Sequence, residues 1–126
     1  MKFSIDRDSF AKLLKKIDSV CTKNGSFAIL ANCLIEAYDQ QITISGTDHT
    51  FTLRVFSKAS VIEEGKVLVN AKLLSDTIQG RPSGTEVVLS SNASQLQVVC
   101  GNFKSRLLLA DDMEYPQIPA YEATPS

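Results

Sequence analysis

The chain has no tryptophan, one histidine (His49) and no apolar run that could cross a membrane. A membrane-spanning helix needs about 20 mostly apolar residues. The first eight residues, Met-Lys-Phe-Ser-Ile-Asp-Arg-Asp, also lack the apolar segment of a secretion signal. We therefore expect no membrane association and a cytoplasmic location. At 126 residues, with 44% hydrophobic and 21% charged residues, the composition is that of one globular domain.

The cysteines form no recognisable metal or disulfide pattern. Cys21, Cys33 and Cys100 are odd in number and contain no Cys-x-x-Cys pair, which argues against a zinc ribbon and a disulfide framework. Cys33 and Cys100 lie in apolar stretches, as reduced buried cysteines commonly do. Three acids near the end, Asp111, Asp112 and Glu114, are more typical of a solvated loop than of a cation site. We expect no metal and no other cofactor.

Residues that could support catalysis are few. The sequence has no G-x-x-x-x-G-K-[ST] phosphate loop and no G-x-S-x-G nucleophile motif. His49 falls in a turn between two expected strands, where a solvated histidine is the usual case. A small enzyme using Asp48, His49 and the acidic loop is an alternative, but it lacks a convergent nucleophile and base. We expect no active site.

The charges are segregated along the chain, although they sum to only −1. Six cations and three acids lie between Met1 and Lys23, whereas four acids and no cation follow residue 110. A net charge of −1 does not by itself indicate a nucleic-acid-binding protein. Segregated charge can nevertheless produce a local positive field.

Hydrophobic periodicity predicts a strand, a helix and three strands in the first half of the chain. The strand spans 2–5, and Asp6 or Asp8 caps the helix that follows. Its apolar residues recur at helical spacing: Phe10, Leu13, Leu14 and Ile17. The next strands are expected at 27–37, 41–46 and 51–56, with a tight turn at Asp39-Gln40.

The same order returns in the second half. A strand at 66–69 leads to Asn70 as a cap, a helix over 71–79 that stops at Gly80, a loop, and strands at 85–90, 95–100 and 103–109. One offset aligns Ile5 with Val69, Asp6 with Asn70, Phe10 with Leu74 and Leu14 with Ile78. The sequence therefore predicts an α+β fold made of a duplicated β-α-β-β-β unit, at about 1–60 and 65–110. Both helices are expected to pack on one side of antiparallel sheets.

The first helix has a cationic face opposite its apolar stripe. Lys12, Lys15, Lys16 and Ser19 recur at helical spacing there, and the exposed side of the second helix is expected to add Lys72, Ser75 and Gln79. Lysines without interleaved aromatic residues suit loose phosphate contacts rather than base stacking. An ordinary solvated helix face is the alternative interpretation, and the residues alone do not decide between them.

Five segments in order resemble one family, the bacterial β sliding clamp, in its N-terminal domain. They are the opening Met-Lys-Phe-Ser-Ile-Asp-Arg-Asp-Ser-Phe, Ala28 to Glu36, Ile44-Ser45-Gly46-Thr47-Asp48, Val69-Asn70-Ala71-Lys72, and Gly101 through Tyr115-Pro116. The resemblance implies a DNA-clamp fold over residues 1–119, with 120–126 as the truncated start of an interdomain linker. The chain departs from the family pattern at Ser26-Phe27-Ala28, Gln79 and Asn102. We therefore expect fewer contacts with DNA and with the second subunit than in a strongly basic member of the family.

The resemblance also implies a function. Members of this family are subunits of DNA polymerase III without catalytic activity: three domains per chain, and two chains head to tail, form a ring around duplex DNA that tethers the replicative polymerase independently of sequence. The residues implied to face DNA are Lys12, Lys15, Lys16, Lys23, Asn24 and Lys72. Those implied at the contact with a second clamp subunit are Thr77, Asn102, Lys104 and Leu107. Polymerase and clamp-loader subunits would bind mainly to later domains, outside this chain.

A second interpretation of the resemblance remains open. The chain could be a stand-alone clamp-like protein-interaction domain that binds a partner through a free strand edge and never encircles DNA.

Overall fold

The computed structural model describes residues 1–21, 32–47, 52–92 and 94–109. In these ranges the chain forms, in order, β1 (Lys2–Asp6), α1 (Arg7–Cys21), β2 (Asn32–Tyr38), β3 (Gln41–Thr47), β4 (Thr52–Lys58), β5 (Ser60–Glu63), β6 (Gly65–Asn70), α2 (Ala71–Gln79), β7 (Glu86–Ser91), β8 (Gln95–Cys100) and β9 (Phe103–Leu108). The α+β fold class expected from the sequence is confirmed.

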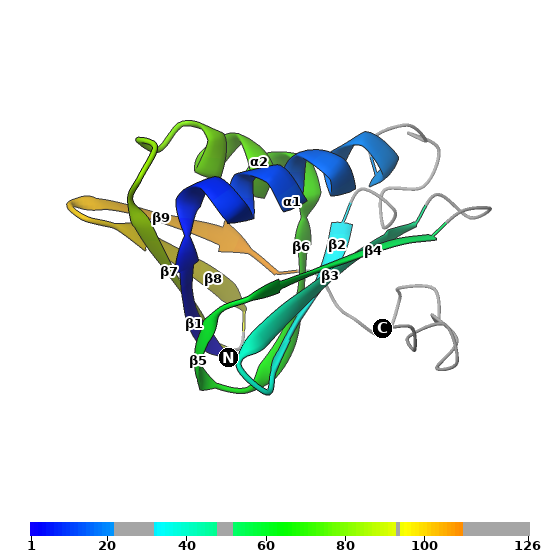
Figure 1. Cartoon of the computed structure of the whole chain (residues 1–126), viewed down its shortest axis with the longest axis horizontal. Coiled ribbons are helices and arrows are strands. Elements are labelled where there is room, and N and C mark those ends of the chain that lie inside the picture. The colour runs from blue at the N-terminus through cyan, green and yellow to red at the C-terminus, as the bar shows by residue number, and fades with distance from the viewer. Residues whose placement is uncertain (22–31, 48–51, 93, 110–126) are drawn as a thin grey trace.

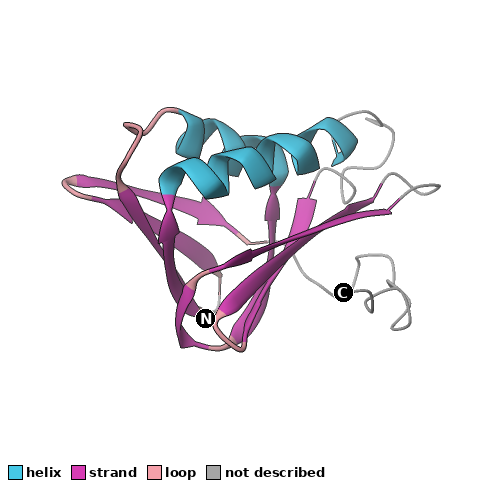
Figure 2. Ribbon diagram, in the orientation of Figure 1, coloured by secondary structure: helices cyan, strands magenta, loops and turns pink. Residues whose placement is uncertain are grey.

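The strands form two antiparallel sheets that share one covering layer of helices. One sheet has the order β5-β1-β7-β8-β9 and the other β4-β3-β2-β6. The sheets meet near the N-terminus and spread toward α1 and α2, which lie side by side across the open side (Figure 1). Both helices therefore lie on one side of the sheets, as predicted (Figure 2).

The two sequence repeats exchange their first strands. β1, from the first repeat, pairs with β7 of the second, and β6, from the second repeat, pairs with β2 of the first. At one corner β4 continues through Ala59 into β5, which passes into the other sheet and pairs with β1. At the opposite corner Leu109, just beyond β9, bridges to Val69. Each sheet therefore contains strands of both repeats.

The core fills the space between the helices and the inner faces of the sheets. Phe10, Leu14 and Ile17 of α1 are fully buried, and the rings of Phe10 and Phe3 pack edge to face with 6.1 Å between centroids. Alternate residues of the strands, such as Ile42 and Ile44 in β3, complete the core. The apolar stripe predicted for the first helix is therefore its buried face.

Equivalent residues cap the two helices. The Asp6 carboxylate accepts a hydrogen bond from the Ser9 amide at 3.0 Å, and the Asn70 side chain accepts one from the Leu73 amide at 2.9 Å. Such side chains satisfy backbone N–H groups that a helix leaves unpaired at its start. Both members of the second pair follow those of the first by 64 residues (70 − 6 and 73 − 9). This confirms the internal alignment and selects Asp6, not Asp8, as the first cap.

The observed strands differ from the expected ones in a few places. β5 was not predicted, and the first half therefore has one strand more than the repeat unit. The tight turn is confirmed, with Asp39 and Gln40 at φ values of 54° and 59°, as a two-residue hairpin requires. Of the strand expected at 27–37, residues 27–31 lie outside the described ranges, and the described part ends at Tyr38.

Candidate nucleic-acid interface

Three lysines of α1 share its solvent face. Lys12, Lys15 and Lys16 are exposed, and they alternate with the buried Phe10, Leu14 and Ile17 at the helical repeat. In the part of the chain that the structure describes, none of the three ammonium groups takes part in an ion pair. We call these residues the lysine face. Its ammonium groups are available for an external anion.

The second helix lies against the first and carries much less charge. The Gln79 side-chain amide donates to the Ala11 carbonyl at 2.9 Å and joins the two helices. Lys72 is exposed as predicted, but its ammonium lies 3.6 Å from the Asp76 carboxylate. Ser75, expected on the exposed side, is 4% exposed and belongs to the buried side. That prediction was wrong because position 75 directly follows the buried Leu74, at the edge of the apolar stripe.

The remaining residues implied to face DNA, Lys23 and Asn24, lie outside the described residues. So do His49, Asp48 and the acidic residues 111, 112 and 114. The described ranges contain no group of three or more histidine, cysteine, aspartate or glutamate side chains that could hold a metal ion. Neither helix in those ranges has the length and apolar content of a membrane span.

A network around Arg7 fixes the start of α1 against the end of α2. The Arg7 guanidinium donates to the carbonyls of Ile78 at 3.2 Å and Gln79 at 2.8 Å, and to the Asp8 carboxylate at 3.0 Å. A cation at the C-terminal end of a helix is favourable, because the last carbonyls have no partner within the helix. Arg7 therefore has a structural role and adds little to the charge of the lysine face.

The Asp8 carboxylate extends this network to the loop after α2. It accepts hydrogen bonds from the Ser83 hydroxyl at 3.0 and 3.1 Å and from the Gly84 amide at 3.3 Å. The hydrogen bond from Arg7, followed by that from Ser83, lowers the pKa of Asp8 below its ordinary value, against a smaller opposing effect of desolvation. Asp8 thus acts as an ionised link between α1 and the 81–84 loop.

The implied subunit contact surrounds β9, the edge strand of the five-stranded sheet. The Leu109 amide donates to the Ser94 carbonyl at 2.9 Å, and alternate residues of an antiparallel strand face the same neighbour. Leu107, Ser105 and Phe103 therefore direct their backbone groups to β8. No strand of the described ranges runs along the other side of β9, which we call its open edge, and the N–H and C=O groups on that side belong to Lys104, Arg106 and Leu108.

The four residues implied at that contact occupy different environments. Lys104 is exposed on β9, whereas Leu107 is partly buried against the core. Asn102 lies in the two-residue turn before β9 rather than on the strand. Thr77, on α2, donates its hydroxyl to the Leu73 carbonyl at 2.8 Å.

Arg81 connects the end of α2 to β9. Its guanidinium carbon lies 3.5 Å from the centre of the Phe103 ring, and its Nε donates to the Thr77 carbonyl at 3.3 Å. Cation–π contacts of this kind hold a guanidinium flat against an aromatic face. The contact therefore positions the end of α2 relative to the edge strand.

Sequence reasoning missed several residues of these surfaces. Asp76 could have been found, because it stands four residues after Lys72 and such pairs meet on a helix face. Leu108, 76% exposed on β9, follows from strand alternation once Leu107 is placed inward. The contacts of Arg7 with residues 78 and 79 join positions 71 and 72 residues apart, for which the sequence carries no local signal.

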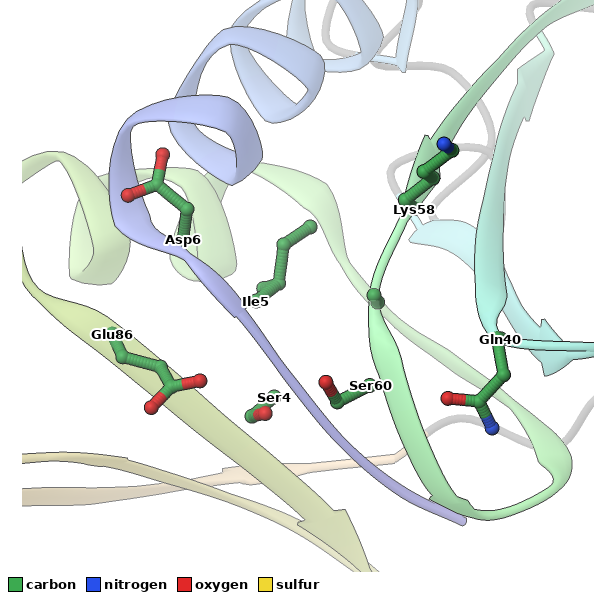
Figure 3. Close-up of a pocket in the computed structure, with 8 residues that line it drawn as sticks. Ser4, Ile5, Asp6, Gln40, Lys58, Ser60 and Glu86 are labelled. Carbon is green, nitrogen blue, oxygen red and sulfur yellow. The ribbon is translucent and has the colours of Figure 1, made fainter.

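One hollow lies at the corner between the sheets (Figure 3). Its lining residues are Ser4, Ile5, Asp6, Gln40, Lys58, Ala59, Ser60 and Glu86. The Gln40 side chain is occupied there, because its amide donates to the Val61 carbonyl at 2.8 Å and accepts from the Val61 amide at 3.2 Å. The hollow contains none of the predicted site residues.

Comparison with known proteins gives consistent matches over nearly the whole chain. Residues 1–121 match the family described as "DNA polymerase III beta subunit, N-terminal domain". The beta sliding clamp of Chlamydia pneumoniae is 29% identical over 119 residues, covering 94% of this chain and 32% of that protein. The beta sliding clamp of Streptomyces coelicolor is 30% identical over 119 residues, covering 94% of this chain and 31% of that protein.

Solved structures show the same fold. The sliding clamp of Bartonella birtlesii, bound to griselimycin, superposes with a TM-score of 0.88 at 27% identity, over 94% of this chain and 32% of that one. The Helicobacter pylori beta clamp, bound to a DNA ligase peptide, has a TM-score of 0.87 over 94% of this chain and 33% of that one; at 19% identity it supports the fold alone. The chain spans about a third of the length of these relatives.

Proposed function

The chain belongs to the family of DNA polymerase III beta subunit N-terminal domains, and on that premise we propose that it forms one domain of a ring-shaped sliding clamp. The family consists of non-catalytic processivity factors. In such a ring this domain would supply part of the wall around duplex DNA, and the complete clamp would tether the replicative polymerase. This domain would have no active site of its own and would act in the cytoplasm.

The lysine face is the observation that carries the proposal. Its three ammonium groups are exposed and make no ion pair within the described ranges, and the buried opposite side fixes the helix that presents them. Phosphate contacts position a protein on a duplex but carry no sequence information. An interface of lysines alone therefore suits a ring that holds DNA without stopping at any sequence.

We expect replacement of Lys12, Lys15 and Lys16 by glutamate to abolish most of the DNA binding of this chain. Each phosphate contact adds about 0.9 to the slope of log affinity against log salt. Loss of all three contacts should lower that slope by up to about 2.7. Titration of a short DNA duplex at several salt concentrations, followed by amide chemical shifts, would measure both quantities even where binding is weak.

A matched control separates the lysine face from total charge. Lys2, Lys58 and Lys66 are exposed on strands rather than on α1, and their replacement by glutamate makes the same change of net charge. The control should keep clearly more affinity than the α1 variant. Equal loss in both would contradict the role of the lysine face, and circular dichroism would verify that both variants fold.

A second clamp subunit is the partner proposed for the β9 edge. An unpaired edge strand can accept an added strand through its free N–H and C=O groups. Lys104 and Asn102, with Thr77 of α2, lie on or near that edge, and the exposed Leu108 adds apolar surface. The backbone N–H and C=O groups of Leu107 face β8, so its contact would be limited to its partly buried side chain. Two such contacts would close a head-to-tail homodimer.

Polymerase and clamp-loader subunits are proposed partners of the complete clamp. They would bind through later domains, outside this chain. Two similar solved structures, of clamps from other organisms, are bound to a DNA ligase peptide and to griselimycin. The relatives described above are all sliding clamps, which gives no support to the stand-alone interpretation.

A further inference from the structure

The two helices that lie side by side differ in charge. α1 contains Arg7, Lys12, Lys15 and Lys16 against Asp8 and Asp18, a net charge of +2 (four minus two). α2 contains only Lys72 and Asp76, which cancel. These two side chains are 64% and 62% exposed and lie 3.6 Å apart. The one ammonium of α2 thus has a carboxylate beside it, whereas those of the lysine face make no ion pair within the described ranges.

Helix stability does not account for Asp76. An exposed lysine–acid pair at this spacing contributes about 0.3–0.5 kcal/mol at most, and less when the lysine precedes the acid, as here. Asp76 also lies in the last turn of α2, where the helix dipole disfavours an anion. The two effects largely offset each other, so the fold gains little from this carboxylate.

We propose that Asp76 weakens phosphate binding at α2 and thereby restricts DNA contact to the lysine face of α1. The proposal rests on the proposed function and specifies how charge is distributed within the same interface. The carboxylate acts in two ways: it competes with phosphate for the Lys72 ammonium, and it repels any phosphate that approaches α2. DNA would therefore be held along one helix of the domain rather than between both.

Weak phosphate binding at α2 suits an interface that must slide along DNA. Each additional phosphate contact that breaks during sliding has to be re-formed at the next step. A domain that uses one cationic helix and one neutral helix makes fewer such contacts at any position. Asp76 would therefore favour movement along DNA over tight holding.

Replacement of Asp76 by asparagine tests the proposal with almost no change of shape. The variant frees Lys72 and raises the local charge by one. The expected result is two- to fourfold tighter binding of a short DNA duplex at low salt, with a salt slope larger by up to about 0.9. Over the range from about 50 to 200 mM salt, that slope difference corresponds to about a 3.5-fold change in affinity. Amide shifts caused by DNA should extend from α1 to residues 72 and 73.

Glu63→Gln is the matched control, because Glu63 is exposed, its strand β5 lies at the end of the sheets away from the helices, and its replacement changes net charge equally (Figure 1). Affinity of Asp76→Asn no higher than that of Glu63→Gln would overturn the proposal. In that case, loss of binding in the Lys12, Lys15 and Lys16 variant would still support the proposed function. If that triple variant also bound like the wild-type chain, the proposed function and the role of Asp76 would both fail.

Discussion

Arg7 is the residue whose role in the structure differs most from the one that its place in the sequence indicates. In the sequence it stands among six cations of the N-terminal segment, yet its side chain is only 16% exposed. Its hydrogen bonds go to the last carbonyls of α2 and to Asp8. A count of charges therefore overestimates the cations available to DNA, because burial and partners decide which of them remain free.

Asp8, the neighbour of Arg7, makes part of the stability depend on pH. Its pKa is lowered in the folded protein by the hydrogen bonds from Arg7 and Ser83. A carboxyl group whose pKa is lower in the folded than in the unfolded state favours folding above its unfolded pKa, about 3.9, and loses that contribution as pH falls through the folded pKa. The Asp8 contribution should therefore be complete at neutral pH and absent in strong acid.

Asp8→Asn should lower the thermal midpoint at pH 7, and the difference from the wild-type chain should shrink as the pH falls below about 4. The reason is that asparagine keeps the shape but cannot ionise. Thermal unfolding of both chains across this pH range would measure it. A difference that is constant with pH, or that grows in acid, would contradict the assignment. Glu63→Gln serves as the control, since Glu63 makes no ion pair in the described ranges.

Among the elements, β5 and β9 show what local patterns can and cannot predict. β5 is four residues long, and of these only Val61 is packed against the core, whereas Ile62 is 60% exposed. So short an alternation is not distinguishable from a loop, and the strand exists because β1 offers it a pairing edge. β8 and β9, joined by a two-residue turn, need only local pairing and were predicted almost to the residue.

The open edge of β9 can be tested with proline, which has no N–H to donate. At Arg106 the N–H faces the edge, so proline should cost little beyond its backbone restraint. At Ser105 the N–H faces β8, and proline should lower the free energy of unfolding by about 1–3 kcal/mol more, because a paired acceptor loses its donor. Urea denaturation of Arg106→Pro and Ser105→Pro would measure the difference.

The adjacent positions serve as controls for each other, because both replacements impose the same restraint on φ in the same strand. Equal destabilisation would mean that the β9 backbone is not oriented as described. If Arg106→Pro destabilised the protein more than Ser105→Pro, the N–H of Arg106, not that of Ser105, would face β8. Either result would remove the structural basis for adding a strand at this edge.

For the whole molecule, the sequence predicted the repeat but not the exchange of strands between repeats. The caps Asp6 and Asn70 and the apolar residues of both helices recur at one offset, so the duplicated unit is visible in the sequence. The alternation of apolar and polar residues in each strand would be the same whether β1 paired with β7 or with β2. Hydrophobic periodicity shows which face of a strand is buried but not which strand lies beside it.

The exchange of strands predicts that neither repeat folds alone. A chain of residues 1–64 would keep β1 and β2 but lose β7 and β6, their partners from the other repeat. Its helix would also lose α2, against which it packs. Each half should therefore be largely unfolded by circular dichroism, since short helices are marginal without tertiary contacts.

An equimolar mixture of residues 1–64 and 65–126 should recover the helix signal, with a midpoint that rises with concentration because folding is then bimolecular. The cut leaves both repeats whole and falls between β5 and β6, so no strand is interrupted. A mixture of the first half with a second half carrying Leu74→Asp is the matched control and should stay unfolded, because Leu74 is fully buried. Cooperative unfolding of either half alone would show that β1 or β6 can pair within its own repeat, and the exchanged strands would then not be required for the fold.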